Sequence, residues 1–203
     1  MLTLNSPFVH LCLWTVGLCQ AQTQTTDSER DVLALHASGR QKVAEIGVWH
    51  GVTSSRLLRA MSDTGEFFAI DPYPVGRLGF SVQKIIAQRE LSAFRDRKIV
   101  WLRETGVEAA NRLRAAGEAV DFLFIDGDHS YDGLRADWEA WSPLISSCGI
   151  VACHDSRSSN ERDLSDTGSV RYTSEVILRD SAFRVIDEVH SLTVLRKNKL
   201  PNS

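Results

Sequence analysis

The sequence lacks the cysteine patterns, long apolar runs and basic surplus that would mark several classes of protein. Its four cysteines, in 203 residues, form neither a Cys-x-x-Cys motif nor the spacing of a zinc site. The apolar run at residues 7–18 is too short to span a bilayer, so no membrane association is expected. The formal net charge is −3, with basic residues scattered along the chain. Nothing therefore favours a nucleic-acid partner.

A basic segment is also missing from the N-terminus, where no Lys or Arg precedes Arg30. Secretory signals normally begin with such a segment, so we expect a cytoplasmic protein with free thiols. Residues 1–25 are interpreted as an N-terminal extension that packs on the domain edge or follows a misassigned start. A signal cleaved near Cys19-Gln20-Ala21 is the alternative. Residues 26–203 are assigned to one domain.

The composition, 43% hydrophobic and 24% charged, is typical of a globular domain. Short apolar runs alternate with segments of helical periodicity, which predicts a single doubly wound α/β domain. A two-residue connection at 190–191 predicts that the last two strands are antiparallel. The predicted strands are 42–46, 66–70, 99–102, 122–126, 149–153, 183–189 and 192–195, and the predicted helices are 26–35, 53–61, 82–94, 107–116, 131–144 and 170–178.

The most informative stretch is the buried strand at 122–126 and the polar residues that follow it. The strand ends in Asp126-Gly127-Asp128-His129. Ligands bind at the carboxyl ends of strands in open α/β sheets, so these side chains are candidates for a site. Asp126 is a candidate ligand, and His129 is a candidate general base. The alternatives are a solvated turn, with Asp128 capping the next helix and His129 a histidine of the capping region.

The first strand-to-helix turn carries a second signal, Glu45-x-Gly47-x-x-x-Gly51. Its glycines allow a tight turn and close approach of a ligand. Asp71 lies 20 residues beyond Gly51, where an acid can accept the hydroxyls of a ribose. The Gly-x-Gly-x-x-Gly fingerprint of dinucleotide binding is absent, which favours a nucleoside without phosphates. A plain turn with helpful glycines is the alternative.

These motifs, in this order, resemble class I S-adenosylmethionine-dependent methyltransferases. The matching stretches are Val43–Gly51, Phe68–Asp71, Phe124–Tyr131 and Gly149–Asp155, and they are similar to a bacterial small-molecule O-methyltransferase group that includes catechol and macrolide-sugar enzymes. The resemblance implies a seven-stranded, mostly parallel Rossmann-like sheet with an antiparallel last strand. It also implies S-adenosylmethionine as cofactor, bound by Glu45, Gly47, Gly51, Asp71, Glu104, Thr105 and Asp126.

Metal-dependent relatives bind a divalent cation at positions that match Asp126, His154 and Asp155. The resemblance therefore implies a metal site there, for Mg²⁺ or Mn²⁺, which would acidify an acceptor hydroxyl. His154 stands where relatives usually carry an acid or amide, and a structural histidine is the alternative. Methyl transfer to a hydroxyl also needs a proton acceptor, for which His129 is the candidate.

The predicted function is metal-assisted O-methylation of a hydroxylated small molecule, such as a sugar or phenol, dependent on S-adenosylmethionine. The expected partner is that acceptor, and the polar loop at 157–168 is expected to contribute to its site. Two alternatives stay open: a non-catalytic protein that binds S-adenosylmethionine or a nucleoside metabolite, and an accessory enzyme similar to cephalosporin hydroxylases. The sequence leaves the oligomeric state open, including a homodimer.

Overall fold

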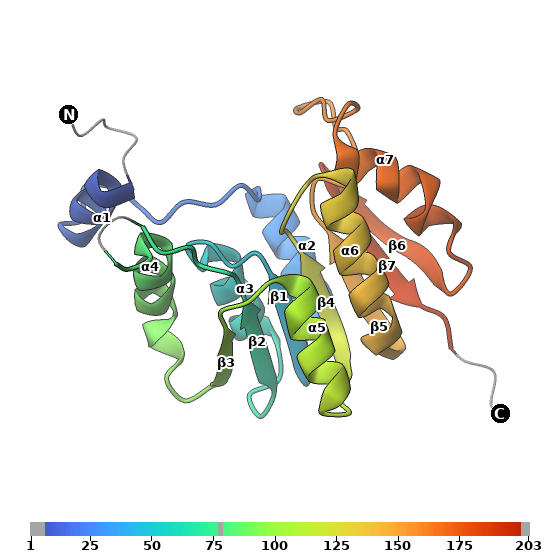
Figure 1. Cartoon of the computed structure of the whole chain (residues 1–203), viewed down its shortest axis with the longest axis horizontal. Helices are drawn as coiled ribbons and strands as arrows, with labels where there is room; N and C mark the ends of the chain where they lie inside the picture. The colour runs from blue at the N-terminus through green and yellow to red at the C-terminus, as the bar shows by residue number, and fades with distance from the viewer. Residues whose placement is uncertain (1–6, 77–78, 200–203) are drawn as a thin grey trace.

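A seven-stranded sheet with helices on both faces forms the body of the protein in the computed structural model, which describes residues 7–76 and 79–199 (Figure 1). The strand order is β3-β2-β1-β4-β5-β7-β6, and only β7 runs antiparallel to its neighbours among the strands described. The strands are β1 (Lys42–Ile46), β2 (Glu66–Ile70), β3 (Lys98–Leu102), β4 (Val120–Ile125), β5 (Ile145–Cys153), β6 (Phe183–Val189) and β7 (Leu192–Lys197). The helices are α1 (Pro7–Thr15), α2 (Asp27–Ala37), α3 (Val52–Ala60), α4 (Val82–Glu90), α5 (Gly106–Ala115), α6 (Tyr131–Trp141) and α7 (Gly168–Glu175).

The predicted fold class, the seven strands and the antiparallel closing strand are confirmed. The largest difference in a boundary is at β5, which begins at Ile145 rather than at 149. Its first residue pairs with Val120, and the register then shifts before the main ladder to β4 begins at Ile150. The intervening residues are largely exposed, so hydrophobicity alone did not mark them as strand.

Both faces of the sheet are buried, each in its own apolar core. Phe122 and Phe124 of β4 pack with residues of α2, α3 and α4, whereas Leu123 and Ile125 pack with residues of α5, α6 and α7. Successive side chains of a strand point to opposite faces, so a strand covered twice must be apolar throughout. This explains the continuous apolar run of β4 and places its carboxyl end in the middle of the molecule.

The order of the strands reverses between β1 and β4, where β2 and β3 lie on one side and β5 to β7 on the other. Such a switch point opens a crevice at the carboxyl ends of the strands. Backbone bonds hold the ends of β1, β4 and β5 together there: the N–H of Asp126 donates to Ile46 O at 2.8 Å, and that of His154 to Ile125 O at 3.0 Å. The candidate residues after β1, β4 and β5 are thereby brought to one place.

The helix α1 packs against α4 at the edge of the domain. The Trp14 indole on α1 donates to Glu90 Oε1 on α4 at 3.0 Å. The chain then crosses the carboxyl ends of the strands and enters α2 (Figure 1). A capping box begins α2, as predicted: Thr26 Oγ1 accepts from Glu29 N, and Glu29 Oε2 accepts from Thr26 N at 2.7 Å. Within residues 7–76 and 79–199, the helices are too short or too polar to cross a membrane.

Candidate active site

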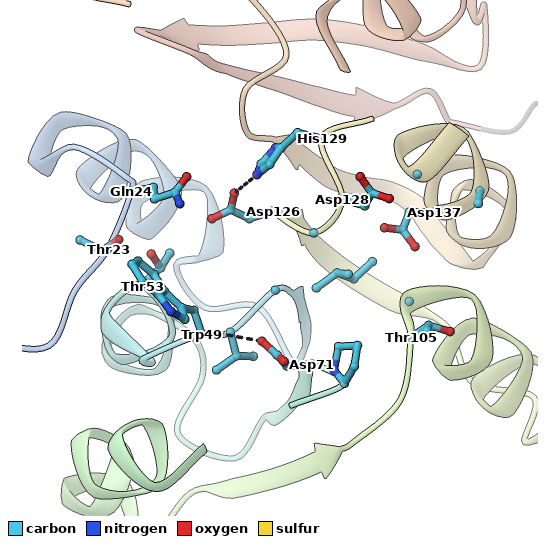
Figure 2. Close-up of a pocket in the computed structure, with 18 of the residues that line it drawn as sticks. Thr23, Gln24, Trp49, Thr53, Asp71, Thr105, Asp126, Asp128, His129 and Asp137 are labelled. Carbon is cyan, nitrogen blue, oxygen red and sulfur yellow. Dashed lines mark hydrogen bonds and ion pairs between the residues drawn. The ribbon is translucent and has the colours of Figure 1, made fainter. Parts of the chain in front are cut away.

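A pocket of about 670 Å³ opens at the switch point. Its walls come from the turns after β1, β2, β3 and β4, from α6, and from the segment that precedes α2. Figure 2 shows Asp71 on one side of the pocket and Asp126 with His129 on another, while Thr105 and Asp137 lie together at one end. The volume is within the range of small-molecule sites.

Gly47, directly after β1, lies against the backbone of Asp126, directly after β4. Its φ is +89°, and a Cβ built on it would lie 2.0 Å from the backbone oxygen of Asp126. Only glycine fits both conditions. Gly51, with a φ of +78°, begins α3 without a side-chain cap. Gly47 lines the pocket as predicted, whereas Gly51 lies behind it, against Ala87 of α4.

Asp71 lines the pocket at the end of β2, where the sequence predicted a ribose contact. Its two carboxylate oxygens accept from the backbone N–H groups of Trp49, at 2.9 Å, and Tyr73, at 2.8 Å. These bonds fix the carboxylate and the turn after β1 in one arrangement. Each oxygen retains a second lone pair, so the pair can also accept from two hydroxyls of a ribose.

Glu45 lies beneath the pocket rather than on its surface. It is 1% exposed, and Ser54 Oγ on α3 donates to its Oε2. Burial, together with the nearby charges of Asp126 and Asp71, raises its pKa well above the ordinary value, against the hydrogen bond from Ser54. The residue therefore links β1 to α3 through Ser54, and its contact with a ligand stays a prediction.

The two residues predicted near the adenine differ in position. Thr105 lines the pocket, but its hydroxyl takes part in the capping box of α5, with Glu108 Oε2 at 2.9 Å. Glu104 does not line the pocket, because both of its oxygens accept from Arg112 at 2.8 Å. Both side chains are therefore engaged by neighbouring residues.

His129 lies between two carboxylates at the edge of the pocket. Its Nε2 is 3.8 Å from Asp126 Oδ1, and its Nδ1 is 3.6 Å from Asp155 Oδ2. The side chain is 36% exposed, so a ligand can reach it. One carboxylate therefore lies within 4 Å of each ring nitrogen. Asp128 instead accepts from the N–H of Ser130, which caps α6, and this supports the structural reading of Asp128.

His154 is fully buried behind Asp126, in contact with a carboxylate on each side. Its Nδ1 is 2.9 Å from Asp126 Oδ1, and its Nε2 is 3.6 Å from Glu29 Oε2. Glu29, on α2, also accepts from the N–H and Oγ of Ser191, at 3.0 and 2.8 Å. No local pattern indicates this role for Glu29, because its partners are far away along the chain.

The charge of His154 follows from these neighbours. Burial alone would lower its pKa, but the nearby carboxylates of Asp126, Glu29 and Asp155 raise it to about 10. Burial alone would raise the pKa of Glu29, but the nearby His154 ring and the hydrogen bonds from Thr26 and Ser191 hold it well below its usual range. The pair is therefore an imidazolium and a carboxylate at neutral pH.

We expect the stability of the protein to fall as the pH rises above about 6.5, the ordinary pKa of histidine. Because the pKa of His154 is raised in the folded state, its charge stabilises the fold fully below the unfolded-state pKa. This stabilisation is lost as the pH approaches about 10. A rise in pKa from about 6.5 to about 10 corresponds to a loss on the order of 5 kcal/mol, measured by urea unfolding across this range. The His154→Gln variant should lack this component, and equal pH dependence in both proteins would contradict the assignment.

The three residues predicted to bind a metal are close together but do not fit a divalent cation. Among the residues that the structure describes, no group of three His, Cys, Asp or Glu side chains is arranged to hold a metal ion. The Arg162 guanidinium donates to Asp155 Oδ1 at 2.8 Å. A protonated His154 has no lone pair to offer. We therefore derive no step through a metal.

Two parts of the pocket were missed from the sequence. Gln22, Thr23 and Gln24 line it from the segment before α2, and Asp137 lines it from α6. The first three lie in a polar stretch without a motif. Asp137 is three residues after Leu134 and directly before Trp138, a position at which the helical pattern does not distinguish a pocket residue from a solvent-facing one.

Comparisons with known proteins agree with this geometry. A family model described as a methyltransferase domain matches residues 44–156, more than half of the chain. An uncharacterized protein of Sinorhizobium fredii, y4gI, is 27% identical over 128 residues, which are 60% of this chain and 14% of that protein. The chain thus spans about a seventh of the length of this curated relative.

Solved structures share the fold over nearly the whole chain. An O-methyltransferase from Bacillus cereus, in complex with S-adenosylhomocysteine, has a TM-score of 0.63 and 15% identity, over 97% of this chain and 93% of that one. The O-methyltransferase TomG from Streptomyces achromogenes, in complex with S-adenosylmethionine, has a TM-score of 0.66 and 14% identity, over 98% and 92%. At such identities the likeness shows the fold alone. Together with the family match, it confirms the resemblance seen in the motifs: the chain belongs to the methyltransferase domain family and has the fold of the class I S-adenosylmethionine-dependent methyltransferases.

Proposed function

We propose that this protein transfers the methyl group of S-adenosylmethionine to a hydroxyl oxygen of a small molecule. The observation that carries the proposal is the position of His129, a reachable imidazole held between Asp126 and Asp155 at the edge of a pocket that contains Asp71. A nucleoside with its ribose at Asp71 would fill the pocket. The imidazole would then lie beside the part of the cofactor that reacts.

The reaction needs little from the protein beyond position and removal of one proton. The sulfonium carbon is already activated, so the acceptor oxygen attacks it in line, forming a C–O bond as the C–S bond breaks. The hydroxyl proton passes to the imidazole of His129. S-adenosylhomocysteine leaves as a neutral thioether.

Binding of S-adenosylhomocysteine should depend strongly on Asp71. In the wild type, two carboxylate oxygens accept from two backbone N–H groups and, in the proposed complex, from two ribose hydroxyls. Asp71→Asn leaves only one oxygen to accept these bonds. We expect affinity to fall about 10- to 100-fold, the effect of losing one or two such bonds. Titration calorimetry measures the change, and Glu66→Gln, at the opposite end of β2, is the control. No binding of S-adenosylhomocysteine or S-adenosylmethionine by the wild-type protein would overturn the proposed function.

Chelation of metals should leave turnover unchanged. The acids of the site are already paired with His154 and Arg162, so the arrangement does not require a cation. We expect equal rates before and after dialysis against EDTA, and no increase on adding Mg²⁺ or Mn²⁺. A rate that is lost with EDTA and restored by either ion would favour the metal-assisted mechanism instead.

The acceptor is proposed to be a sugar or a phenol. The half-buried imidazole lines the same pocket as the segment 22–24 and lies 3.6 Å from Oδ2 of Asp155, whose Oδ1 accepts from Arg162 of the loop 157–168. The region around His129 is therefore polar and combines parts of the chain that carry hydrogen-bonding groups. Such a surface suits a hydroxylated molecule better than an apolar one.

A further inference from the structure

One buried acid in the pocket has no role in the mechanism above. Asp137, on α6, is 7% exposed and lines the pocket at the end away from His129 (Figure 2). In the part of the chain that the structure describes, its carboxyl makes neither a hydrogen bond nor an ion pair. A buried carboxyl without a donor is costly, and its usual compensation is a partner that the protein lacks when empty.

Small residues surround Asp137 in the pocket. A Cβ on Gly106 would lie 2.1 Å from Asp137 Oδ1, and a Cβ on Gly127 would lie 3.3 Å from Oδ2. The carboxyl therefore packs against two stretches of backbone that carry no side chain. Ala136 adds another small residue to the same end of the pocket. A larger side chain at these positions would fill space beside the carboxyl.

The other candidates for contact with a base are already engaged. Glu104 is held by Arg112 outside the pocket, and the hydroxyl of Thr105 is held by Glu108. Asp128 is exposed to solvent and bonded to the N–H of Ser130. Asp137 is therefore the buried acceptor at this end, among the residues described. Burial first, and then the charge of Asp128, raises its pKa to about 6, so it is still largely ionised at neutral pH.

We propose that Asp137 accepts a hydrogen bond from the exocyclic amino group of the cofactor's adenine and so selects a 6-amino purine over a 6-oxo purine. The inference rests on the proposed function, because it requires the nucleoside to lie with its ribose at Asp71 and its base toward α5 and α6. A carboxylate can only accept, so it attracts an amino group and repels a carbonyl oxygen. Asp137 is thus a specificity-determining residue, and it takes no part in the transfer itself.

The test compares S-adenosylhomocysteine with S-inosylhomocysteine, whose base carries an oxo group in place of the 6-amino group and a proton on N1. In calorimetry near pH 7.5, we expect the wild-type protein to prefer the adenosyl compound about 10- to 100-fold. Asp137→Asn presents an amide that can donate to an oxo group or accept from an amino group. This variant should therefore bind the two ligands within about threefold of each other.

Glu139→Gln is the matched control, because it removes one negative charge from an exposed position of the same helix. It should keep the wild-type preference. If Asp137→Asn does not fold, as judged by circular dichroism, Asp137→Ser replaces it, since a hydroxyl also donates and accepts.

Equal affinity of the wild-type protein for both ligands, with the adenosyl compound bound, would overturn the role of Asp137 alone. A preference that survives in both Asp137 variants would do the same. Absence of binding to either compound would instead overturn the proposed function itself.

Discussion

Gly47→Ala is expected to lower the free energy of unfolding by about 4 kcal/mol, a large part of what a domain of this size possesses. The added Cβ would lie 2.0 Å from the backbone oxygen of Asp126, and neither strand end can move without breaking the ladder between β1 and β4. The φ of +89° adds a conformational penalty of roughly 1–2 kcal/mol. Urea unfolding measures the total.

Gly39→Ala separates the two contributions to this loss. Gly39 also has a positive φ, +70°, but a Cβ there would meet nothing within 4 Å. We expect it to cost only the conformational penalty, about 1 kcal/mol. Similar losses in both variants would show that the contact between Gly47 and Asp126 is not what the structure indicates.

The same substitution should also affect the site, because Gly47 and Asp126 both line the pocket. Any Gly47→Ala protein that still folds must move the backbone of Asp126 away from β1. That movement would displace His129, which follows Asp126 by three residues and is paired with it. Such a protein should bind S-adenosylhomocysteine weakly or not at all, whereas Gly39→Ala should bind it normally.

His129→Gln is expected to lower kcat about 10²- to 10⁴-fold, the usual contribution of a general base. Glutamine has similar size and polarity but cannot take a proton from the acceptor. The cofactor should still bind, because Asp71 and Gly47 are untouched, and affinity for S-adenosylhomocysteine should stay within about twofold of the wild-type value. The measurement is transfer of labelled methyl to whichever acceptor the wild type methylates fastest in a panel of sugars and phenols.

His36→Gln provides the comparison for this variant. His36, on α2, is paired with Asp187 of β6 at 3.0 Å, and it does not line the pocket. It should leave kcat unchanged. An unchanged kcat in His129→Gln would show that His129 is not the general base. A fall in kcat with an equal fall in cofactor affinity would assign His129 to binding.

The buried pair of His154 and Glu29 explains why the metal prediction and the structure differ. His154 and Asp155 directly follow β5, where relatives hold a cation. The metal prediction rested on this position along the chain alone. The structure brings Glu29 to the far side of the imidazole, 3.6 Å from Nε2. The cluster then contains its own positive charge, next to Asp126, within the protein interior.

The sequence by itself determined the elements and the location of the site. Continuous apolar strands, the capping box at Thr26, the glycine at 47 and the acid at 71 all depend on near neighbours and on order along the chain. Each is visible as a local pattern. Because parallel strands end at the same edge of a sheet, the alternation of strands and helices was enough to gather Asp71, Asp126 and His129 around one pocket.

Only the tertiary structure decided which polar groups face one another. Glu104 pairs with Arg112, Asp155 with Arg162, and Glu29 with Ser191, 162 residues away. The orientation of Asp137 into the pocket and the addition of residues 22–24 to its wall were also settled by packing. The physical reason is that a polar side chain is satisfied by whatever group the fold places within about 3 Å of it. These polar contacts form between segments that are distant along the chain, so no pattern within one segment predicts them.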